Sequence, residues 1–446
     1  MTPPTTPPAG ETGGLRRTLG AADLTLIVIG AVIGSGIFLV PSLVMQRSGG
    51  SVPIATSVWL VGGILSLLGA LSYAELGAMD SEAGGLYAYI RDGFGRFPAF
   101  LYGWTLFFVI ASGSVATLAV AATNYMGQFA ELSATMRKVV PVALIALMAV
   151  INVLGTRGSA SVANTATAIK VFAILAMSAI LFAMGDADAA SAAVTLPALA
   201  PATLSGIGLS LISVLWAYEG WQYVTFSAGE ARDPQRDLPK AIALGTAFLV
   251  ALYLLANFAY LHALGPARVA ASERVASEAM EVVLGPAAGT IIALAIIVSM
   301  YSAAHAIVIT APRVYYQMAR DGVFFRRLAD VHPRYGTPAV AIVASCVVAA
   351  VLAVSGTFET LLTYVVFVGW IFYALGAGAV IALRRKRPDA PRPFRVPGYP
   401  VTPILFIAAA AAIVLNQVVS QPVSSAIGIG MVLLGAPVYL LWRKKA

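Results

Sequence analysis

Cysteine, histidine and charged residues are all scarce in this sequence of 446 residues. The single cysteine, Cys346, falls inside an apolar run, which excludes a disulfide framework and leaves no loop thiol to tether another chain. The three histidines form no H-E-x-x-H motif and no pair suited to bind haem. We therefore expect no metal, no cofactor and no enzymatic reaction.

The low charge content is matched by an excess of apolar residues. Charged residues make up 11% and hydrophobic residues 59% of the chain, with a mean hydropathy of +0.86. In a typical soluble domain, about 25% of residues are charged and about 45–50% are apolar. Apolar runs of about 20 residues, enough to cross a bilayer core about 30 Å thick, recur along the chain. The sequence predicts an all-α integral membrane protein with twelve spans, starting near Ala21, Val52, Phe97, Val139, Ser161, Leu204, Leu238, Ala287, Pro338, Glu359, Val401 and Val423.

The formal charge of +8 is explained by the topology of these spans. An even number of spans puts both termini on one side, and 22 of the 28 Lys and Arg residues fall on that side, against five on the other and one within a span. By the positive-inside rule, both termini are cytoplasmic in a multi-pass protein of the cell (inner) membrane. No nucleic-acid partner is needed. Residues 1–14, rich in Pro and Thr, are expected to form a disordered cytoplasmic tail.

The first span is interrupted by glycine. Residues 27–41 read IVIGAVIGSGIFLVP, and an open backbone in hydrocarbon costs several kcal/mol unless protein or a cavity satisfies it. Gly30 and Gly34 have the spacing that allows close helix packing. Alternatively, the helix breaks at Gly34-Ser35-Gly36 and offers free N–H and C=O groups to a ligand.

A second interruption favours the ligand site. In LWAYEGWQY, residues 215–223, Glu219 and Gly220 intrude into an apolar span, where a carboxylate costs about 2.5–3.5 kcal/mol or more. The breaks fall in the first and sixth spans, so each opens a group of five helices. Interrupted segments at matching positions of two halves indicate a secondary transporter with inverted repeats.

Lys170 lies several residues inside the fifth span, NTATAIKVFAILAM. Its side chain either snorkels to the interface or occupies a polar pocket and donates hydrogen bonds to carbonyls released by the first break. In the second case, the fixed cation disfavours a sodium ion at the same place. Lys170 then acts either as a permanent charge or as a proton carrier, and the sequence leaves both open.

Three motifs resemble a known family. LRRTLGAADLTLIVIGAVIGSGIFLVP, LSYAELGAMDSEAGGLYAYIRDGFG and WAYEGWQYVTFSAGEARDPQRDLPKAI occur in this order and spacing. They resemble the amino acid–polyamine–organocation superfamily. Together with Lys170 and RPDAPRPFRVPGYPVTP, they are most similar to the L-type amino acid transporters and their bacterial exchanger relatives. The resemblance covers about residues 15 to 440.

This resemblance implies a LeuT-type fold of twelve transmembrane helices. Residues 15–200 would form the first five-helix repeat and residues 201–385 the second, with two peripheral helices in residues 386–446. It also implies a set of site residues. The substrate carboxylate would meet the backbone of Gly34, Ser35 and Gly36, and the amine would meet carbonyls near Val32 and at Trp216, Ala217 and Glu219.

Trp216 would also serve as an aromatic gate. Lys170 matches the family's sodium-replacing lysine, and Ser299 matches its partner on the eighth span. His305, Val365 and Gly369 correspond to positions near the side-chain pocket.

The sequence departs from the animal members at several of these positions. Val365 and Gly369 replace an aromatic residue and an amide, which would enlarge the pocket unless Trp216 fills it. Glu219 replaces a small residue; it either counters a cationic side chain or, as we favour, hydrogen-bonds neighbouring helices. His305 is best interpreted as a packed polar residue. The loop GQFAELSATMRK lacks the cysteine through which animal members join a glycoprotein, so no disulfide-linked accessory subunit is expected.

Charged residues near the expected cytoplasmic ends allow two interpretations. One cluster combines three basic and three acidic residues: Arg232, Arg236 and Lys240 with Glu230, Asp233 and Asp237. This cluster either closes an inner gate through ion pairs or forms an ordinary charged surface. Glu75 in YAELG is expected to be solvated or paired.

These features together predict a sodium-independent carrier that moves L-amino acids by alternating access, most simply as an exchanger. A proton-coupled symporter of an amino acid or a polyamine is the alternative within transport. A non-transporting sensor or a channel is the alternative from another class. A sensor would need an attached signalling domain and a channel a continuous polar stripe, and the sequence suggests neither.

Overall fold

The computed structural model describes residues 19–79, 84–154, 159–186 and 201–443. These ranges are helical, with no β-strand beyond one isolated bridge between Leu19 and Ala231. The predicted tail, residues 1–14, and the predicted end of the first repeat, residues 187–200, lie outside the described residues.

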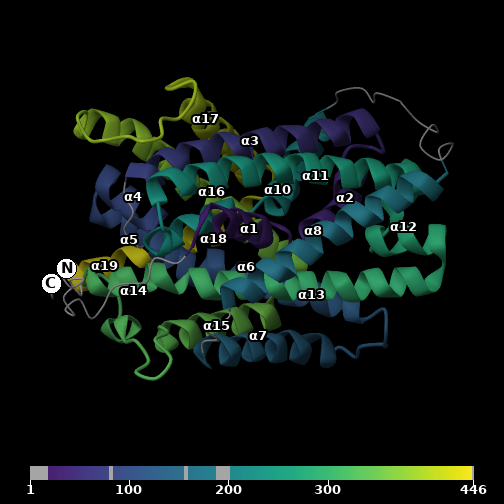
Figure 1. Ribbon diagram of the computed structural model, residues 1–446, viewed down its shortest axis with the longest axis horizontal. Helices are drawn as coiled ribbons and strands as arrows, with labels where there is room; N and C mark the ends of the chain where they lie inside the picture. Colours follow the sequence, from purple (N-terminus) through teal and green to yellow (C-terminus); the bar gives the residue numbers. More distant parts are fainter. Residues whose placement is uncertain (1–18, 80–83, 155–158, 187–200, 444–446) are drawn as a thin grey trace, which may run out of the picture.

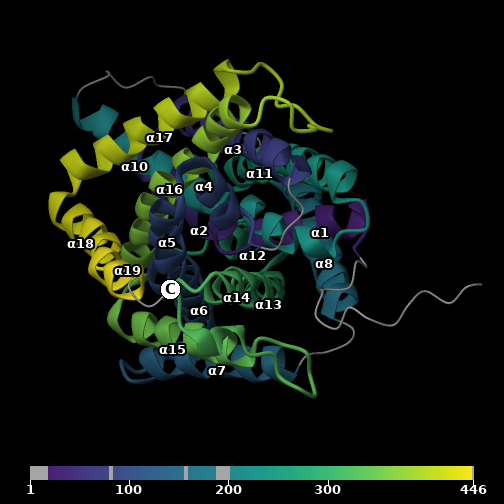
Figure 2. The ribbon, with the colours of Figure 1, turned by 90° about the vertical axis from the view of Figure 1, so that its left-hand side faces the viewer.

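The helices follow one another along the chain (Figures 1 and 2). They are α1 (Ala21–Val32), α2 (Gly36–Arg47), α3 (Val52–Met79), α4 (Leu86–Phe94), α5 (Arg96–Thr105), the π-helical η1 (Leu106–Ile110), α6 (Ala111–Met126), α7 (Met136–Leu154), α8 (Ser159–Met184), α10 (Pro201–Ala217), the 3₁₀ helix η2 (Trp221–Glu230), α11 (Pro234–Ala271), α12 (Val275–Leu284), α13 (Pro286–Thr310), α14 (Pro312–Arg320), the 3₁₀ helix η3 (Arg326–Ala329), α15 (Ala339–Ser355), α16 (Phe358–Lys386), α17 (Val401–Ser420), α18 (Pro422–Leu433) and α19 (Gly435–Arg443).

The described chain has nine helical segments that are long and apolar enough to cross a membrane, and ten if the bent pair α1 and α2 counts as one span. Two further apolar helices, α10 and α15, have 17 residues each. At 1.5 Å per residue, such a helix spans about 25 Å, short of a bilayer core of about 30 Å. A helix starts near each of the twelve predicted positions. Because α10 and α15 are this short, the exact count of twelve spans is not confirmed.

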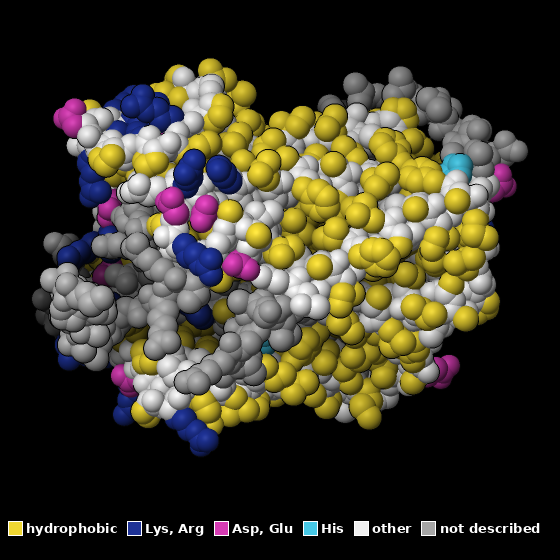
Figure 3. All heavy atoms as spheres, in the orientation of Figure 1, with side chains coloured by type: hydrophobic (Ala, Val, Ile, Leu, Met, Phe, Trp, Pro, Cys, Tyr) yellow, Lys and Arg dark blue, Asp and Glu magenta, His cyan; other side chains and the backbone are white. Residues whose placement is uncertain are grey.

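The outer helices present apolar side chains to their surroundings. Val347 and Val351 on α15 are 58% and 64% exposed, and Leu147 and Val150 on α7 are 50% and 56% exposed. Figure 3 shows a broad apolar surface, while Lys and Arg gather at the end of the molecule where α4 and α19 lie. We call this the basic end. The broad apolar surface is suited to contact with lipid, and the protein is a multi-pass membrane protein.

The centre of the bundle is formed by the helices that carry the two predicted breaks. In Figure 1, α1 and α2 lie between a group that includes α3 and α11 and a group that includes α6 and α13, with α7 and α15 outermost. Glycines allow close packing inside the first group. A Cβ on Gly63 of α3 would lie 2.8 Å from Val250 of α11, and one on Gly245 of α11 would lie 2.9 Å from Val28 of α1.

Glu75, which was expected to be solvated or paired, is paired. It is fully buried on α3, and Arg384 of α16 donates to both carboxylate oxygens, at 2.8 and 2.7 Å. The backbone N–H of Val396 donates to the same carboxylate at 2.7 Å. This charge-assisted cluster joins α3, α16 and the segment before α17 at the basic end.

Candidate functional site

The first predicted break is present between α1 and α2. Helix α1 ends at Val32, α2 begins at Gly36, and their axes differ by 46°. The last carbonyls of α1 have no partner further along the same helix. The first N–H groups of α2 are left without helical acceptors for the same reason. A polar patch of backbone therefore lies in the middle of the bundle.

The second break separates α10 from η2. Helix α10 ends at Ala217, and Gly220 has a φ of 132°, a conformation that favours glycine. The chain then continues as the 3₁₀ helix η2 from Trp221. This break again leaves carbonyls at the end of one helix, including that of Ala217, while the carbonyl of Trp216 accepts a hydrogen bond from the backbone N–H of Glu219 at 3.0 Å.

The two breaks lie directly against each other. A Cβ on Gly36 would overlap the Cα of Ala217, and a Cβ on Gly220 would lie 2.8 Å from the carbonyl carbon of Ala31. Each break thus contributes a glycine that meets the backbone of the other. The close approach brings the N–H groups of α2 near the carbonyls that end α1 and α10.

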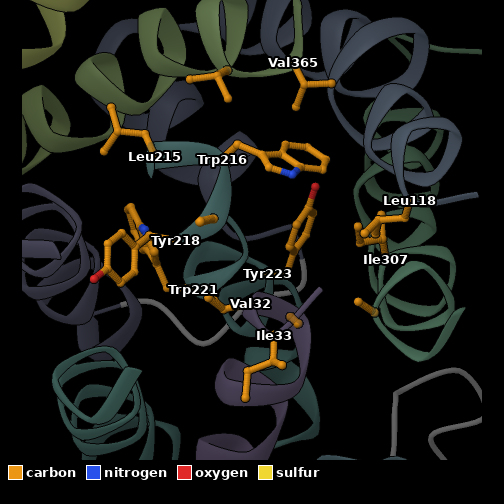
Figure 4. Packing of buried hydrophobic residues seen from close by; sticks show 14 of the residues in the cluster. Val32, Ile33, Leu118, Leu215, Trp216, Tyr218, Trp221, Tyr223, Ile307 and Val365 are labelled. Carbon is orange, nitrogen blue, oxygen red and sulfur yellow. The ribbon is translucent and has the colours of Figure 1, made fainter. Parts of the chain in front are cut away.

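A narrow cavity of about 20 Å³, room for about one water molecule, opens at this junction. Its lining residues come from both breaks and from the facing helices α6 and α13: Ala31, Val32, Gly34, Ser35, Gly36, Ser114, Leu118, Trp216, Glu219, Tyr223 and Ile307. Figure 4 shows Trp216 and Tyr223 on the side of Leu118 and Ile307, whereas Tyr218 and Trp221 project to the opposite side. The cavity has a polar backbone floor and largely apolar walls.

Lys170 of α8 reaches the first break from outside this cavity. Its Nζ lies 3.4 Å from the carbonyl oxygen of Gly30 and 3.2 Å from that of Ile33, and Ser299 of α13 donates to the same Ile33 oxygen at 3.3 Å. The side chain is buried, so it does not snorkel to the surface. The partial negative charge at the end of α1 favours an ammonium here.

An apolar groove runs along the outer side of this lysine. It has a volume of about 340 Å³ and lies between α8 and α13, and Lys170 and Ser299 are its polar residues. Ile169 and Val298 on its rim are 62% and 64% exposed. The groove faces the surroundings of the bundle and is separate from the cavity between the breaks.

The aromatic side chain predicted as a gate is tied to the first break. The indole N–H of Trp216 donates to the hydroxyl of Ser35 at 3.1 Å, and both residues are buried. In Figure 4, the indole lies between Val365 of α16 and the cavity.

Comparison with known proteins identifies the family. The family model described as "Amino acid permease" matches residues 19–441. The chain belongs to the amino acid permease family. This family lies within the superfamily that the motifs around both breaks resemble.

Three relatives of this amino acid permease are similar along nearly its whole length. "Serine/threonine exchanger SteT" of Bacillus subtilis (strain 168) is 30% identical, covering 98% of this chain and 99% of the relative. The human "Large neutral amino acids transporter small subunit 2" is 30% identical, covering 98% and 84%. The human "b(0,+)-type amino acid transporter 1" is 31% identical, covering 92% and 85%. All three names describe amino acid carriers rather than enzymes.

Glu219 lines the cavity of the permease, but its carboxylate is already engaged. The Oε1 atom accepts hydrogen bonds from Gln222, at 2.5 Å, and from the hydroxyl of Tyr373 on α16. Both donors are buried. This geometry agrees with the favoured interpretation that Glu219 joins neighbouring helices.

Three predicted pocket residues lie apart from the lining. His305 contacts Asn152 of α7, with 3.0 Å between Nδ1 and Nδ2. Gly369 packs against the ring of Tyr373, and Val365 packs against Gly113. On an α-helix, positions two apart differ by about 200°, so Ile307 faces the cavity while His305 faces α7.

Several lining residues were not predicted from the sequence. Ser114 and Leu118 stand four apart on α6, and Ile307 lies on α13. The four-residue spacing marks one helix face but not which face meets the cavity. Tyr223 was within the quoted motif LWAYEGWQY without being assigned a role.

Proposed function

We propose that this permease exchanges L-amino acids across the cell membrane without sodium. The observation that carries the proposal is the position of Lys170. Its ammonium donates to the Gly30 and Ile33 carbonyls, with Ser299 on the same Ile33 oxygen. These are oxygen ligands of the kind that a small cation would require. A resident positive charge at this point opposes a sodium ion, so transport has no need of a sodium gradient.

The two breaks provide for both ends of a zwitterion. The free N–H groups and positive helix end at Gly34, Ser35 and Gly36 are suited to the substrate carboxylate. The carbonyls near Val32 and of Trp216, Ala217 and Glu219 are suited to the ammonium group. Transporters use broken helices in the membrane interior in this way.

The cavity walls favour neutral side chains of modest size. The cavity side chains of Trp216, Leu118 and Ile307 are largely apolar. The Oε1 atom of Glu219 accepts two hydrogen bonds, which hold this carboxylate against Gln222 and Tyr373. The relative named as a serine/threonine exchanger supports substrates of this class.

Alternating access follows from two groups of helices that meet at the cavity. The first group packs closely through glycines in α3 and α11, and Gly245 of α11 brings this group against α1. The second is joined by polar contacts, such as that between His305 of α13 and Asn152 of α7 and that between Ser112 of α6 and Ser345 of α15. Rocking of one group against the other would open the site to each side in turn.

The architecture proposed with this mechanism is the twelve-span LeuT-type fold. Helices α10 and α15 would be its two short spans. The repeats would be residues 15–200 and 201–385, followed by two peripheral helices, because a break lies in the first span of each repeat. Both termini would be cytoplasmic. No disulfide-linked subunit is expected, since Cys346 is buried in α15.

Proton-coupled symport of an amino acid or a polyamine is the second candidate. The observation that favours it is the carboxylate of Glu219, a titratable group that lines the cavity and is enclosed by Gln222 and Tyr373. A proton taken up there could move with the substrate. Exchange and symport differ in what drives net uptake.

Reconstitution in liposomes distinguishes these mechanisms. Uptake of labelled L-serine and L-leucine is measured into vesicles that contain unlabelled amino acid, and into empty vesicles with an imposed pH gradient. We expect uptake that depends on internal substrate and is unchanged when potassium replaces sodium. Gradient-driven uptake into empty vesicles would favour symport instead. Abolition of uptake by sodium removal would reject the proposed mechanism.

A further inference from the structure

The end of α16 and the chain that follows it form a strongly basic stretch. Residues 384–395, which we call the basic segment, read RRKRPDAPRPFR and contain six basic residues against one acidic residue. The segment lies at the basic end. Figure 3 shows Lys and Arg side chains bordered by hydrophobic ones at the corner where the chain enters α17 in Figure 1. The segment takes no part in the cavity between the breaks.

Four of the six cations are engaged by the protein itself: Arg384, Lys386, Arg387 and Arg392. Arg384 donates to the buried Glu75 and lies against the ring of Tyr399, with 3.7 Å from its Cζ to the ring centre. Arg392 donates to the backbone carbonyls of Leu383, Arg387, Pro388 and Ala390. These contacts fold the segment back on the end of α16, so its shape does not depend on a ligand.

Arg385 and Arg395 are the two cations left over. Both are exposed, and neither side chain has a hydrogen-bond or ion-pair partner among the residues that the structure describes. Their chain neighbours Arg384 and Val396 donate to the same Glu75 carboxylate, so both positions are held on one framework. Two guanidinium groups are thus presented outward with their donors available to an anion.

The basic segment lies next to a surface that is suited to lipid. Helix α17, which is long and apolar enough to cross a membrane, begins at Val401. Val401, Ile404 and Leu405 in its first turns are 57%, 49% and 51% exposed. The start of such a helix marks the boundary between hydrocarbon and headgroups. Arg395, shortly before this start, is therefore placed at the level of lipid phosphates.

We propose that the basic segment binds the headgroup of an anionic phospholipid. Arg385 and Arg395 donate to its phosphate oxygens, because the planar guanidinium group matches a phosphate in a bidentate manner. The acyl chains lie on the exposed apolar side chains at the start of α17. Basic clusters directly beside a membrane helix attract anionic lipids in this way. The site is separate from the cavity, so the proposal does not depend on amino acid exchange.

The chain offers a matched control for the loss of two charges. Arg137 and Lys138 are exposed at the start of α7, where Val139 is 52% exposed, and they are the only basic residues between Met126 and Leu154. The double variant Arg137→Gln with Lys138→Gln therefore removes two cations beside an apolar helix that lacks a basic cluster. It is compared with the double variant Arg385→Gln with Arg395→Gln.

The test measures lipid binding to the purified full-length protein by native mass spectrometry. Phosphatidylglycerol and phosphatidylcholine with identical acyl chains are the probes, and inorganic phosphate is added as a competitor. We expect the wild type to prefer phosphatidylglycerol. Loss of both Arg385 and Arg395 should weaken phosphatidylglycerol binding by about 10- to 30-fold and leave phosphatidylcholine binding unchanged. The control variant should bind both lipids as the wild type does.

Three results would overturn the proposal. Equal affinity of the wild type for the two lipids would show that no anionic headgroup is recognised. Equal loss in both double variants would indicate diffuse attraction to positive charge rather than a site. Inorganic phosphate that binds as tightly as the lipid would assign the segment to a soluble anion.

Single variants keep the test decisive if the double variant is unstable. Unfolding temperatures measured without added lipid check folding, which we expect to be preserved because both arginines are exposed and unpartnered. Arg385→Gln and Arg395→Gln should each cause about a 3- to 5-fold part of the loss. Unchanged phosphatidylglycerol binding by both folded single variants would reject the assigned residues.

Discussion

At the scale of single residues, the most informative contact is between a lysine and two backbone carbonyls. Removing Lys170 would leave the carbonyls of Gly30 and Ile33 without the ammonium that now satisfies them. Ser299 alone cannot replace it, because its hydroxyl has one proton and already donates to Ile33. The end of α1 would then be free to shift away from the cavity.

Lys170→Ala is therefore expected to reduce amino acid exchange by about 10- to 100-fold, the loss that corresponds to one or two charge-assisted hydrogen bonds. Exchange is measured in liposomes, and size-exclusion chromatography checks folding. Lys138→Ala is the matched control, because Lys138 is exposed at the start of α7. Normal exchange by a folded Lys170→Ala protein would contradict the role given to the ammonium.

At the scale of helices, the arrangement depends on two interrupted segments whose backbones touch. Gly36 begins α2 and meets Ala217, while Gly220 meets Ala31. A side chain at either position would force the two interrupted segments apart. Glycine is thus required at both breaks for close approach, in addition to the conformational freedom that Gly220 uses.

The variant Gly36→Ala tests this approach. The added methyl group would overlap Ala217, and overpacking of this kind costs about 1–3 kcal/mol. We expect binding of L-leucine to weaken by about tenfold or more. Gly430→Ala in α18 is the control, because its Cβ would meet no atom within 4 Å. Equal binding by both variants would show that the breaks can separate without consequence.

At the scale of the whole molecule, basic residues at one end indicate orientation. Figure 3 shows Lys and Arg gathered around the basic end, while the opposite end carries few. Glu131, between α6 and α7, and Arg334, between η3 and α15, are both exposed. The predicted topology places their loops on opposite sides of the membrane. The positive-inside rule predicts that Arg334 is cytoplasmic.

Cysteine labelling tests this orientation. The single native cysteine, Cys346, is buried and is first replaced by serine. In intact cells, a membrane-impermeant thiol reagent should label Glu131→Cys but not Arg334→Cys, and permeabilisation should expose the second. Labelling in the reverse order would invert the topology, and uptake by each variant confirms that the labelled protein is functional.

Sequence alone determined the class of the protein, the helix starts and the two interrupted segments. These features are local, because apolar length, glycine and an intramembrane charge each carry a cost in lipid that shows in the sequence. The tertiary structure decided which groups meet. Lys170 and Gly30 are 140 residues apart, and Arg384 and Glu75 are 309 apart. Their contacts depend on how each helix is rotated and where helices cross. The rotation of α13 likewise directs His305 toward α7 and Ile307 into the cavity. The sequence does not reveal this difference, because a buried helix is apolar nearly all round and no face is marked as the one that meets the cavity.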